Sequence, residues 1–180
     1  KAMGLVPEIF NERILNGLKG DMALGHVRYS TTGSSLLVNA QPFCVRHSGH
    51  SMSIAHNGNI VNAHQIRSEL EQNGSIFQTS MDSEVVLHLM ARRMNLGVEQ
   101  AMIEAMGQLR GAYSVVVMTE DSLIAAKDPN GFRPLCLGKL GSGYVLASET
   151  CAFDLVEAEF VRFIEPGEIV IINKEGIKSI

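Results

Sequence analysis

Three short segments of the sequence carry side chains that could bind one small, charged molecule. Arg28 ends an apolar stretch and precedes a hydroxyl-rich segment that contains Thr31, and its guanidinium can hold a carboxylate through two parallel hydrogen bonds. Asn57 and Gly58 offer an amide and an unobstructed N–H, two donors that could bind an oxyanion. Asp82 could bind an ammonium group. Taken singly, these segments also fit a surface arginine, a plain turn and an acid in a helix's first turn.

The pattern of apolar residues predicts the elements that position these side chains. Helical spacing predicts four helices, at 10–19, 63–72, 85–94 and 98–109. Runs rich in β-formers predict strands at 22–29, 52–55, 112–119, 122–127, 135–137, 144–148, 161–164 and 168–172. The late connections are too short for crossover helices, so we expect an α+β layered domain with antiparallel strands in a meander.

Local signals predict turns and helix ends near the candidate residues. The Asn57-Gly58 pair is the strongest short-range signal for a sharp turn with positive φ. Asn62 followed by Gln65 is typical of a capping box, and residues 79–84 supply caps and acids for the next helix. Residues 128–134 have the composition of a tight turn between two strands.

Composition limits the classes of function. The chain has 180 residues, 46% of them hydrophobic, which suits a single domain. A formal net charge of −4 without a tract of like charge argues against nucleic acid and anionic membranes as partners. The longest apolar runs are strand-sized, and no secretory signal is recognisable at the start, so we expect a cytoplasmic protein. Three widely spaced cysteines resemble neither a disulfide framework nor a zinc site.

The order of the motifs is more specific than any one of them. The segments 25–29, 55–59 and 79–84 together resemble the glutaminase domain of class II amidotransferases, which use an N-terminal nucleophile. Downstream, the segments 109–114, 128–135, 148–154 and 165–168 look like those of the amidophosphoribosyltransferase family. This resemblance covers nearly all of the chain.

The resemblance implies a four-layer αββα sandwich with antiparallel sheets, in which residues 1–180 form one glutaminase domain that is incomplete at its N-terminus. In the family, glutamine hydrolysis supplies ammonia for phosphoribosylamine formation from phosphoribosylpyrophosphate, on a phosphoribosyltransferase domain that we expect to be absent here. The nucleophile is a cysteine at the mature N-terminus, whereas this chain begins with Lys1. We therefore expect the chain to lack the nucleophile and to be inactive alone.

The resemblance also implies roles for the candidate residues. Arg28 resembles the arginine that binds the α-carboxylate of glutamine, with Thr31 in the adjoining substrate loop, and Asp82 resembles the acid that binds the α-amino group. Asn57, by its side chain, and Gly58, by its backbone N–H, resemble the oxyanion hole.

For the full-length parent, the resemblance implies a homo-oligomer that holds Mg and, in some members, a [4Fe–4S] cluster. Cys151 resembles one ligand of that cluster, and a lone thiol cannot hold it, so we expect no cofactor in this chain. Two alternatives remain open. The chain could belong to another class II amidotransferase, such as the hexosamine-forming aminotransferase or asparagine synthetase, or it could be a nucleophile-free domain for glutamine binding or assembly.

Overall fold

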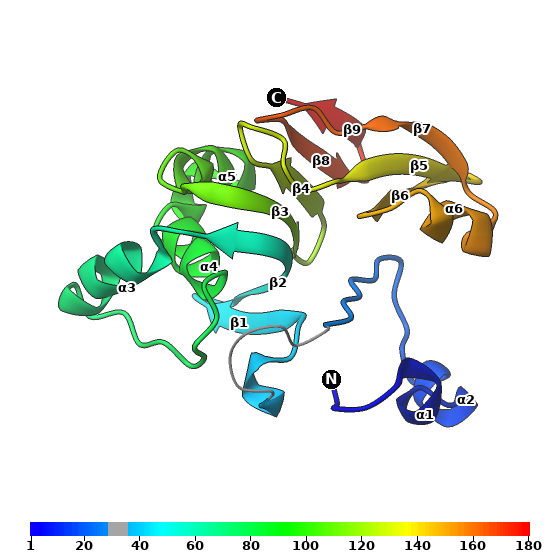
Figure 1. The fold of residues 1–180 in the computed structure, drawn as a ribbon, viewed down its shortest axis with the longest axis horizontal. Helices are drawn as coiled ribbons and strands as arrows, with labels where there is room; N and C mark the ends of the chain where they lie inside the picture. Colours follow the sequence, from blue (N-terminus) through cyan, green and yellow to red (C-terminus); the bar gives the residue numbers. More distant parts are fainter. Residues whose placement is uncertain (29–35) are drawn as a thin grey trace.

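The computed structural model describes residues 1–28 and 36–180, and Figure 1 shows its helices and strands. The helices are α1 (Val6–Ile9), α2 (Glu12–Leu15), α3 (Ala63–Gln72), α4 (Glu84–Ala91), α5 (Val98–Met106) and α6 (Cys151–Val156), with 3-10 turns η1 (Leu37–Asn39) and η2 (Met94–Leu96). The strands are β1 (Phe43–His47), β2 (His50–Ile60), β3 (Gly111–Met118), β4 (Leu123–Lys127), β5 (Cys136–Leu140), β6 (Gly143–Ala147), β7 (Glu159–Phe163), β8 (Ile169–Asn173) and β9 (Gly176–Ser179).

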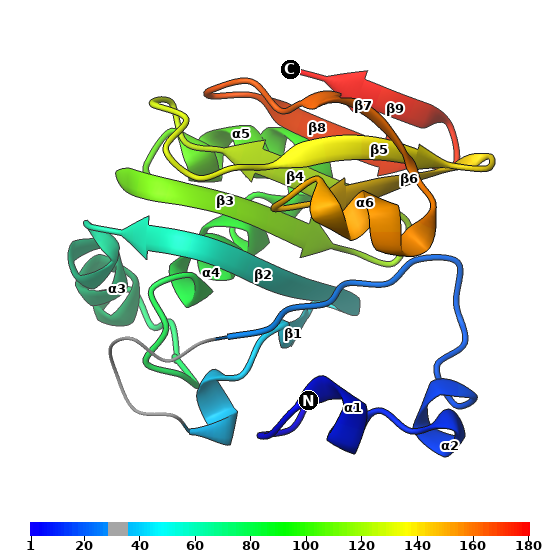
Figure 2. The same ribbon diagram turned by 45° about the vertical axis from the view of Figure 1, so that its right-hand side comes forward.

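The strands form two sheets rather than one meander. The larger sheet has the order β1-β2-β3-β4-β8-β9, and the smaller has the order β6-β5-β7 (Figure 2). Neighbouring strands in both are antiparallel, as expected. The chain leaves the larger sheet after β4 and returns at β8, because the turn at 128–134 directs it into the smaller sheet.

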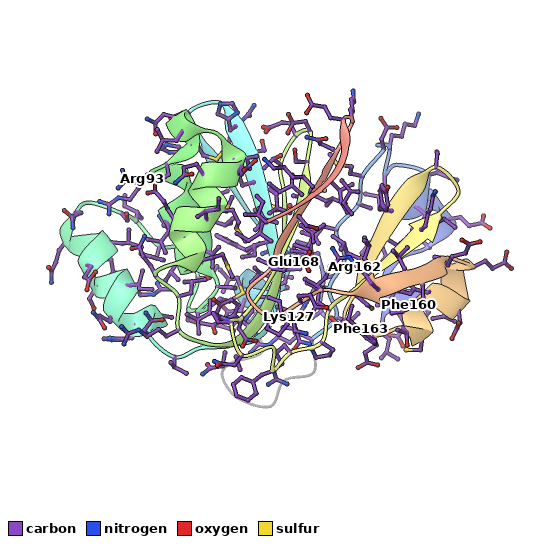
Figure 3. All side chains as sticks on the ribbon, turned by 90° about the horizontal axis from the view of Figure 1, so that it is seen from above. Arg93, Lys127, Phe160, Arg162, Phe163 and Glu168 are labelled. Atoms are coloured by element: carbon purple, nitrogen blue, oxygen red, sulfur yellow. The ribbon has the colours of Figure 1, made fainter. Side chains whose placement is uncertain are left out.

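The layers follow the order helices, sheet, sheet, helix, as Figure 3 shows from above. The main core lies between the larger sheet and helices α3 to α5, and includes Ile54, Val115 and Met102, all with no exposed surface. A second cluster, which includes Leu137 and Val170, packs between the sheets. On the outer face of the smaller sheet, α6 contributes a buried phenylalanine whose ring lies over Gly138 of β5. The expected αββα order is therefore present.

Two predicted elements near the start of the chain are wrong. The region 10–19 contains only the four-residue helix α2, which buries no residue, so a longer helix would gain nothing from packing. Residues 22–27 alternate in exposure as a strand would, but residues 22–28 have no strand assignment, because no described strand pairs with them. The sequence analysis also missed β1, β9 and α6. Among the described residues, no helix has the length and hydrophobicity needed to span a bilayer.

Candidate functional site

The pair Asn57-Gly58 lies inside strand β2, so the predicted turn is wrong. Gly58 has a φ of 137°, and a Cβ atom added to it would lie 2.0 Å from the carbonyl oxygen of Ala112 on β3. Such a contact is well inside van der Waals distance. Glycine is therefore required here because the neighbouring backbone passes so close, and positive φ occurs without a change of chain direction.

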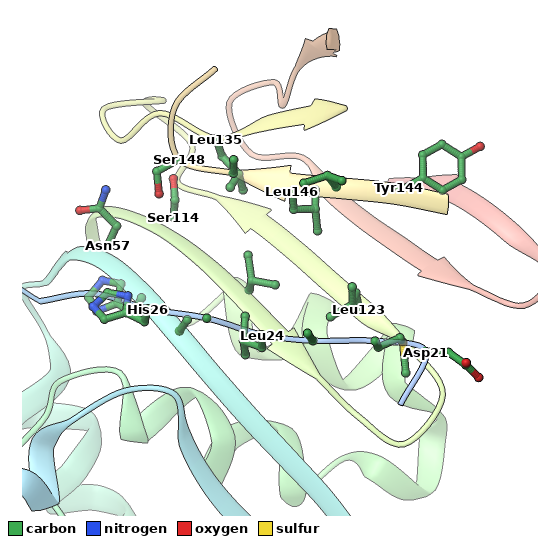
Figure 4. A pocket seen from close by; sticks show the side chains of 18 residues that line it. Asp21, Leu24, His26, Asn57, Ser114, Leu123, Leu135, Tyr144, Leu146 and Ser148 are labelled. Atoms are coloured by element: carbon green, nitrogen blue, oxygen red, sulfur yellow. The ribbon is translucent and has the colours of Figure 1, made fainter. Parts of the chain in front are cut away.

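Asn57 points away from the helices, into a cavity of about 360 Å³ between the sheets. Its partner across the β2–β3 ladder is Ser114. Figure 4 shows Asn57, Ser114 and Ser148 at one end of this cavity and Asp21 at the other. The remaining wall is largely apolar, with Leu135 among the lining residues. The volume suits a small molecule or a short extended segment, with the Asn57 amide as a donor at one end.

Asp82 lies beside the same stretch of β2. Its Oδ2 accepts a hydrogen bond from the backbone N–H of Ile60 at 2.8 Å, and its Oδ1 lies 3.3 Å from Nδ1 of His56. The N–H of Ser83 donates to Oδ1 at 2.8 Å. These donors tie an acid to a strand that precedes it by more than twenty residues. The structure thus brings Asp82 to His56 and Ile60, the residues of β2 that flank the segment 57–59.

The surroundings keep Asp82 ionised. Burial raises the pKa of this carboxyl, but the hydrogen bond and positive charge of His56, together with the N–H groups of Ile60 and Ser83, outweigh it and hold the pKa below its ordinary value. The side chain of Asp82 is still 29% exposed. A carboxylate that stays charged and accessible can receive a ligand's ammonium group.

Arg28 lies at the end of the extended segment 21–28. Burial lowers the pKa of His26, and the charges of His56 and Arg28 lower it further, so both residues lie within electrostatic range of His26. Arg28 is exposed and interacts with a neighbouring residue. His56, one of the two residues that act on His26, is the residue that contacts Asp82. Thr31 lies outside the described residues.

The helix-capping predictions around the site were wrong in detail. The Asn62 side chain caps no N–H of α3. It accepts a hydrogen bond from the N–H of Arg110 at 2.8 Å and donates one to the carbonyl of Gln108 at 2.9 Å, which joins the start of α3 to the segment between α5 and β3. Ser83 precedes α4 without a side-chain capping bond. For Asn62, tertiary partners take the polar groups that a local pattern assigned to a helix end. The buried Ser83 hydroxyl has no hydrogen-bond partner among the described residues.

Two residues that support the site were not identified from the sequence. Glu84 has no exposed surface, and it accepts hydrogen bonds from the backbone of the segment that carries Asp82. Asn39, also buried, exchanges hydrogen bonds with Ser80 of that segment. The run of apolar residues that follows Glu84 was a signal for the first, because a helix that is apolar on all sides is buried.

Known proteins resemble this chain in sequence and in fold. The family described as glutamine amidotransferase domain matches residues 26–154, which include Arg28, Asn57, Gly58, Asp82 and Cys151. The chain belongs to the glutamine amidotransferase domain family. The glutamine amidotransferase family inferred from the ordered motifs is thereby confirmed.

The relatives of this amidotransferase domain are longer proteins. It is 51% identical over 177 residues to amidophosphoribosyltransferase 2, chloroplastic, of Arabidopsis thaliana, covering 98% of this chain and 32% of the relative. It is 48% identical over 180 residues to the amidophosphoribosyltransferase of Bacillus subtilis, covering 99% of this chain and 38% of the relative. The chain thus spans about a third of the length of these relatives.

A solved structure described as the allosteric regulatory enzyme of purine biosynthesis superposes with a TM-score of 0.93 at 48% identity, covering 98% of this chain and 38% of that chain. This agreement confirms the fold class expected from the motifs.

Proposed function

We propose that this amidotransferase domain is the glutaminase part of an amidophosphoribosyltransferase, which hydrolyses glutamine to supply ammonia for phosphoribosylamine formation from phosphoribosylpyrophosphate in de novo purine synthesis. The observation that carries the proposal is the 48–51% identity to such enzymes along 98–99% of the chain. The same identity favours this enzyme over the hexosamine-forming aminotransferase and asparagine synthetase.

The proposed roles of the site residues follow from the chemistry of their surroundings. The ionised Asp82 binds the α-ammonium group of glutamine, and Arg28, with Thr31, binds its α-carboxylate. The Asn57 amide and the Gly58 N–H stabilise the oxyanion that forms when a nucleophile attacks the side-chain amide. Support comes from the direct contacts of Asp82 with β2, within four residues of Asn57.

The nucleophile is the N-terminal cysteine of the family, which we place outside this chain. Of the three thiols here, Cys136 is buried, and burial raises its pKa, which disfavours the thiolate. Cys44 and Cys151 are exposed, and neither lines the cavity that Asn57 faces. We therefore propose that the chain alone releases no glutamate from glutamine. Measurable release by the purified chain would contradict this.

A test of the roles uses the complete enzyme that contains this domain. Asn57→Ala and Asp82→Ala each lower glutamine-dependent phosphoribosylamine formation, Asn57→Ala by about 10²–10³ in turnover, as for other oxyanion donors. Both variants keep the activity with added ammonia, because ammonia bypasses the glutaminase site. An equal loss with glutamine and ammonia would refute the assignment.

The remaining proposals concern the complete enzyme, where we place the phosphoribosyltransferase domain in the same chain, a homo-oligomer, Mg and a cytoplasmic location. Cys151 is a proposed ligand of a [4Fe–4S] cluster. Its exposed thiol at the start of α6 can share a cluster with cysteines of another domain. The described residues contain no group of three side chains that could hold a metal ion by themselves. Iron analysis of a Cys151→Ser variant tests this; unchanged iron content would rule the ligand out.

A further inference from the structure

The segment that carries Asp82 is irregular, so side chains must hold it in place. It connects α3 to α4 without joining a sheet. Glu84, at the start of α4, accepts hydrogen bonds from the N–H groups of Gln78 and Thr79, each at 2.8 Å. Its Oε2 also accepts from the Thr79 hydroxyl at 2.6 Å. A fully buried carboxylate that accepts three hydrogen bonds holds the backbone of this segment in position.

The Thr79 side chain links Glu84 to Met81, the residue before Asp82. Its hydroxyl donates to Glu84 and accepts from the N–H of Met81 at 3.1 Å, so both of its hydrogen-bonding directions are used. On the opposite side, Arg67 of α3 donates to the carbonyl of Met81 at 3.0 Å and lies 3.9 Å from Glu84. The backbone of Met81 is thus held at its N–H and at its carbonyl.

We propose that Thr79, Glu84 and Arg67 are positioning residues for substrate binding, which set where the Asp82 carboxylate stands relative to β2. This inference rests on the proposed role of Asp82 as the acid that binds the α-ammonium group. The three residues contact the backbone that precedes Asp82. They do not contact its carboxylate, which His56 and Ile60 hold. Because a charge pair depends steeply on geometry, a small displacement of this segment weakens glutamine binding before it affects chemistry.

The test compares Thr79→Val and Thr79→Ser in the complete enzyme. Valine keeps the shape and removes the hydroxyl, so we expect KM for glutamine to rise about tenfold with a smaller change in kcat. Serine restores the hydroxyl and brings KM back to within about twofold of the original. Activity with added ammonia stays unchanged in both. Arg67→Met, at a partly exposed position, gives a second variant that raises KM in the same way should Thr79→Val fail to fold.

Thr119→Val is the matched control. Thr119 is equally buried, and its hydroxyl bonds Asp121 and the N–H of Ser122 in the turn after β3, at the end of the strand away from Gly58. We expect a comparable loss of stability in urea with an unchanged KM. A similar rise of KM in Thr79→Val and Thr119→Val, or none in Thr79→Val and Arg67→Met, would overturn the proposal.

Asp82→Asn separates this inference from the proposed function. If Asp82 binds the ammonium group, Asp82→Asn alone raises KM for glutamine, and Thr79→Val adds little to it because both changes act through one carboxylate. An unchanged KM in Asp82→Asn would instead refute the role of Asp82. Full additivity of the two changes would refute only the positioning role of Thr79.

Discussion

Replacing Gly58 by alanine tests the close approach of β2 and β3 at the proposed oxyanion hole. The added Cβ atom would lie 2.0 Å from the Ala112 oxygen and 2.7 Å from the Tyr113 Cα. Carbon and oxygen atoms in contact need about 3.4 Å, so one backbone must move by more than about 1 Å. The φ of 137° adds strain of about 1–3 kcal/mol for any residue with a Cβ. With overpacking of similar size, we expect a loss of roughly 3 kcal/mol or more in the free energy of unfolding.

The assay is urea unfolding followed by circular dichroism, with Gly49→Ala as the control. Gly49 has a φ of 88° in the β1–β2 hairpin, and a Cβ added there meets nothing within 4 Å. That variant therefore reports the cost of positive φ alone, about 1 kcal/mol. In the complete enzyme, Gly58→Ala also lowers glutamine-dependent turnover by about 10² or more, because the Gly58 N–H is displaced. Equal unfolding free energies for the two variants would refute the steric argument.

Two further predictions concern charge and thiol reactivity. The Arg162 guanidinium lowers the pKa of Glu168 to about 2 through hydrogen bonds of 2.6 and 2.8 Å, so their contribution to stability is complete above the ordinary pKa of 4.5 and is lost as pH falls toward 2. Arg162→Met should cost about 1 kcal/mol at pH 7, because Arg162 is partly exposed, and should flatten the acid limb of the stability curve; an unchanged limb would count against this pair. With a thiol reagent at neutral pH, Cys44 and Cys151 should be modified before Cys136, since burial raises the pKa of the Cys136 thiol; mass spectrometry of peptides would expose the reverse order.

The sequence predicted best those elements whose apolar spacing matches the face they bury. The helix predicted at 63–72 coincides with α3, whose Ile66 and Leu70 are buried on one side. The helices predicted at 85–94 and 98–109 begin within one residue of α4 and α5 but end too late. Apolar residues continue beyond each helix, so periodicity alone could not show where the helices stop.

The wrong predictions share a physical cause. Residues distant in the sequence, and not the local composition, determine the structure at these positions. Asn57-Gly58 has the composition of a hairpin turn, yet β3 pairs with β2 through this point, and the ladder keeps the chain straight. Gly111, with a φ of 140°, would meet the oxygen of Asn59 at 2.2 Å if it had a Cβ. A glycine on each strand thus allows the backbones of β2 and β3 to come close together. The sequence of one strand alone does not show this approach.

The grouping of the site residues could be predicted only in part. The resemblance named Arg28, Asn57, Gly58 and Asp82, but no sequence pattern indicated that His56 would contact Asp82. That contact exists because α3 and the following segment return the chain to β2, where Asp82 accepts the N–H of Ile60.

The same contacts explain why the acid is placed on an irregular segment rather than within α4. In a helix, the carboxylate would be restricted to the positions that the helix surface presents, whereas here it reaches a backbone donor of a neighbouring strand. Ordering such a segment costs conformational entropy, and an irregular segment has no regular backbone hydrogen bonds that offset this cost. The buried carboxylate of Glu84 restores that order through the N–H groups of Gln78 and Thr79. The proposed binding of an ammonium group by Asp82 therefore depends on a second acid, Glu84, that does not contact the ligand.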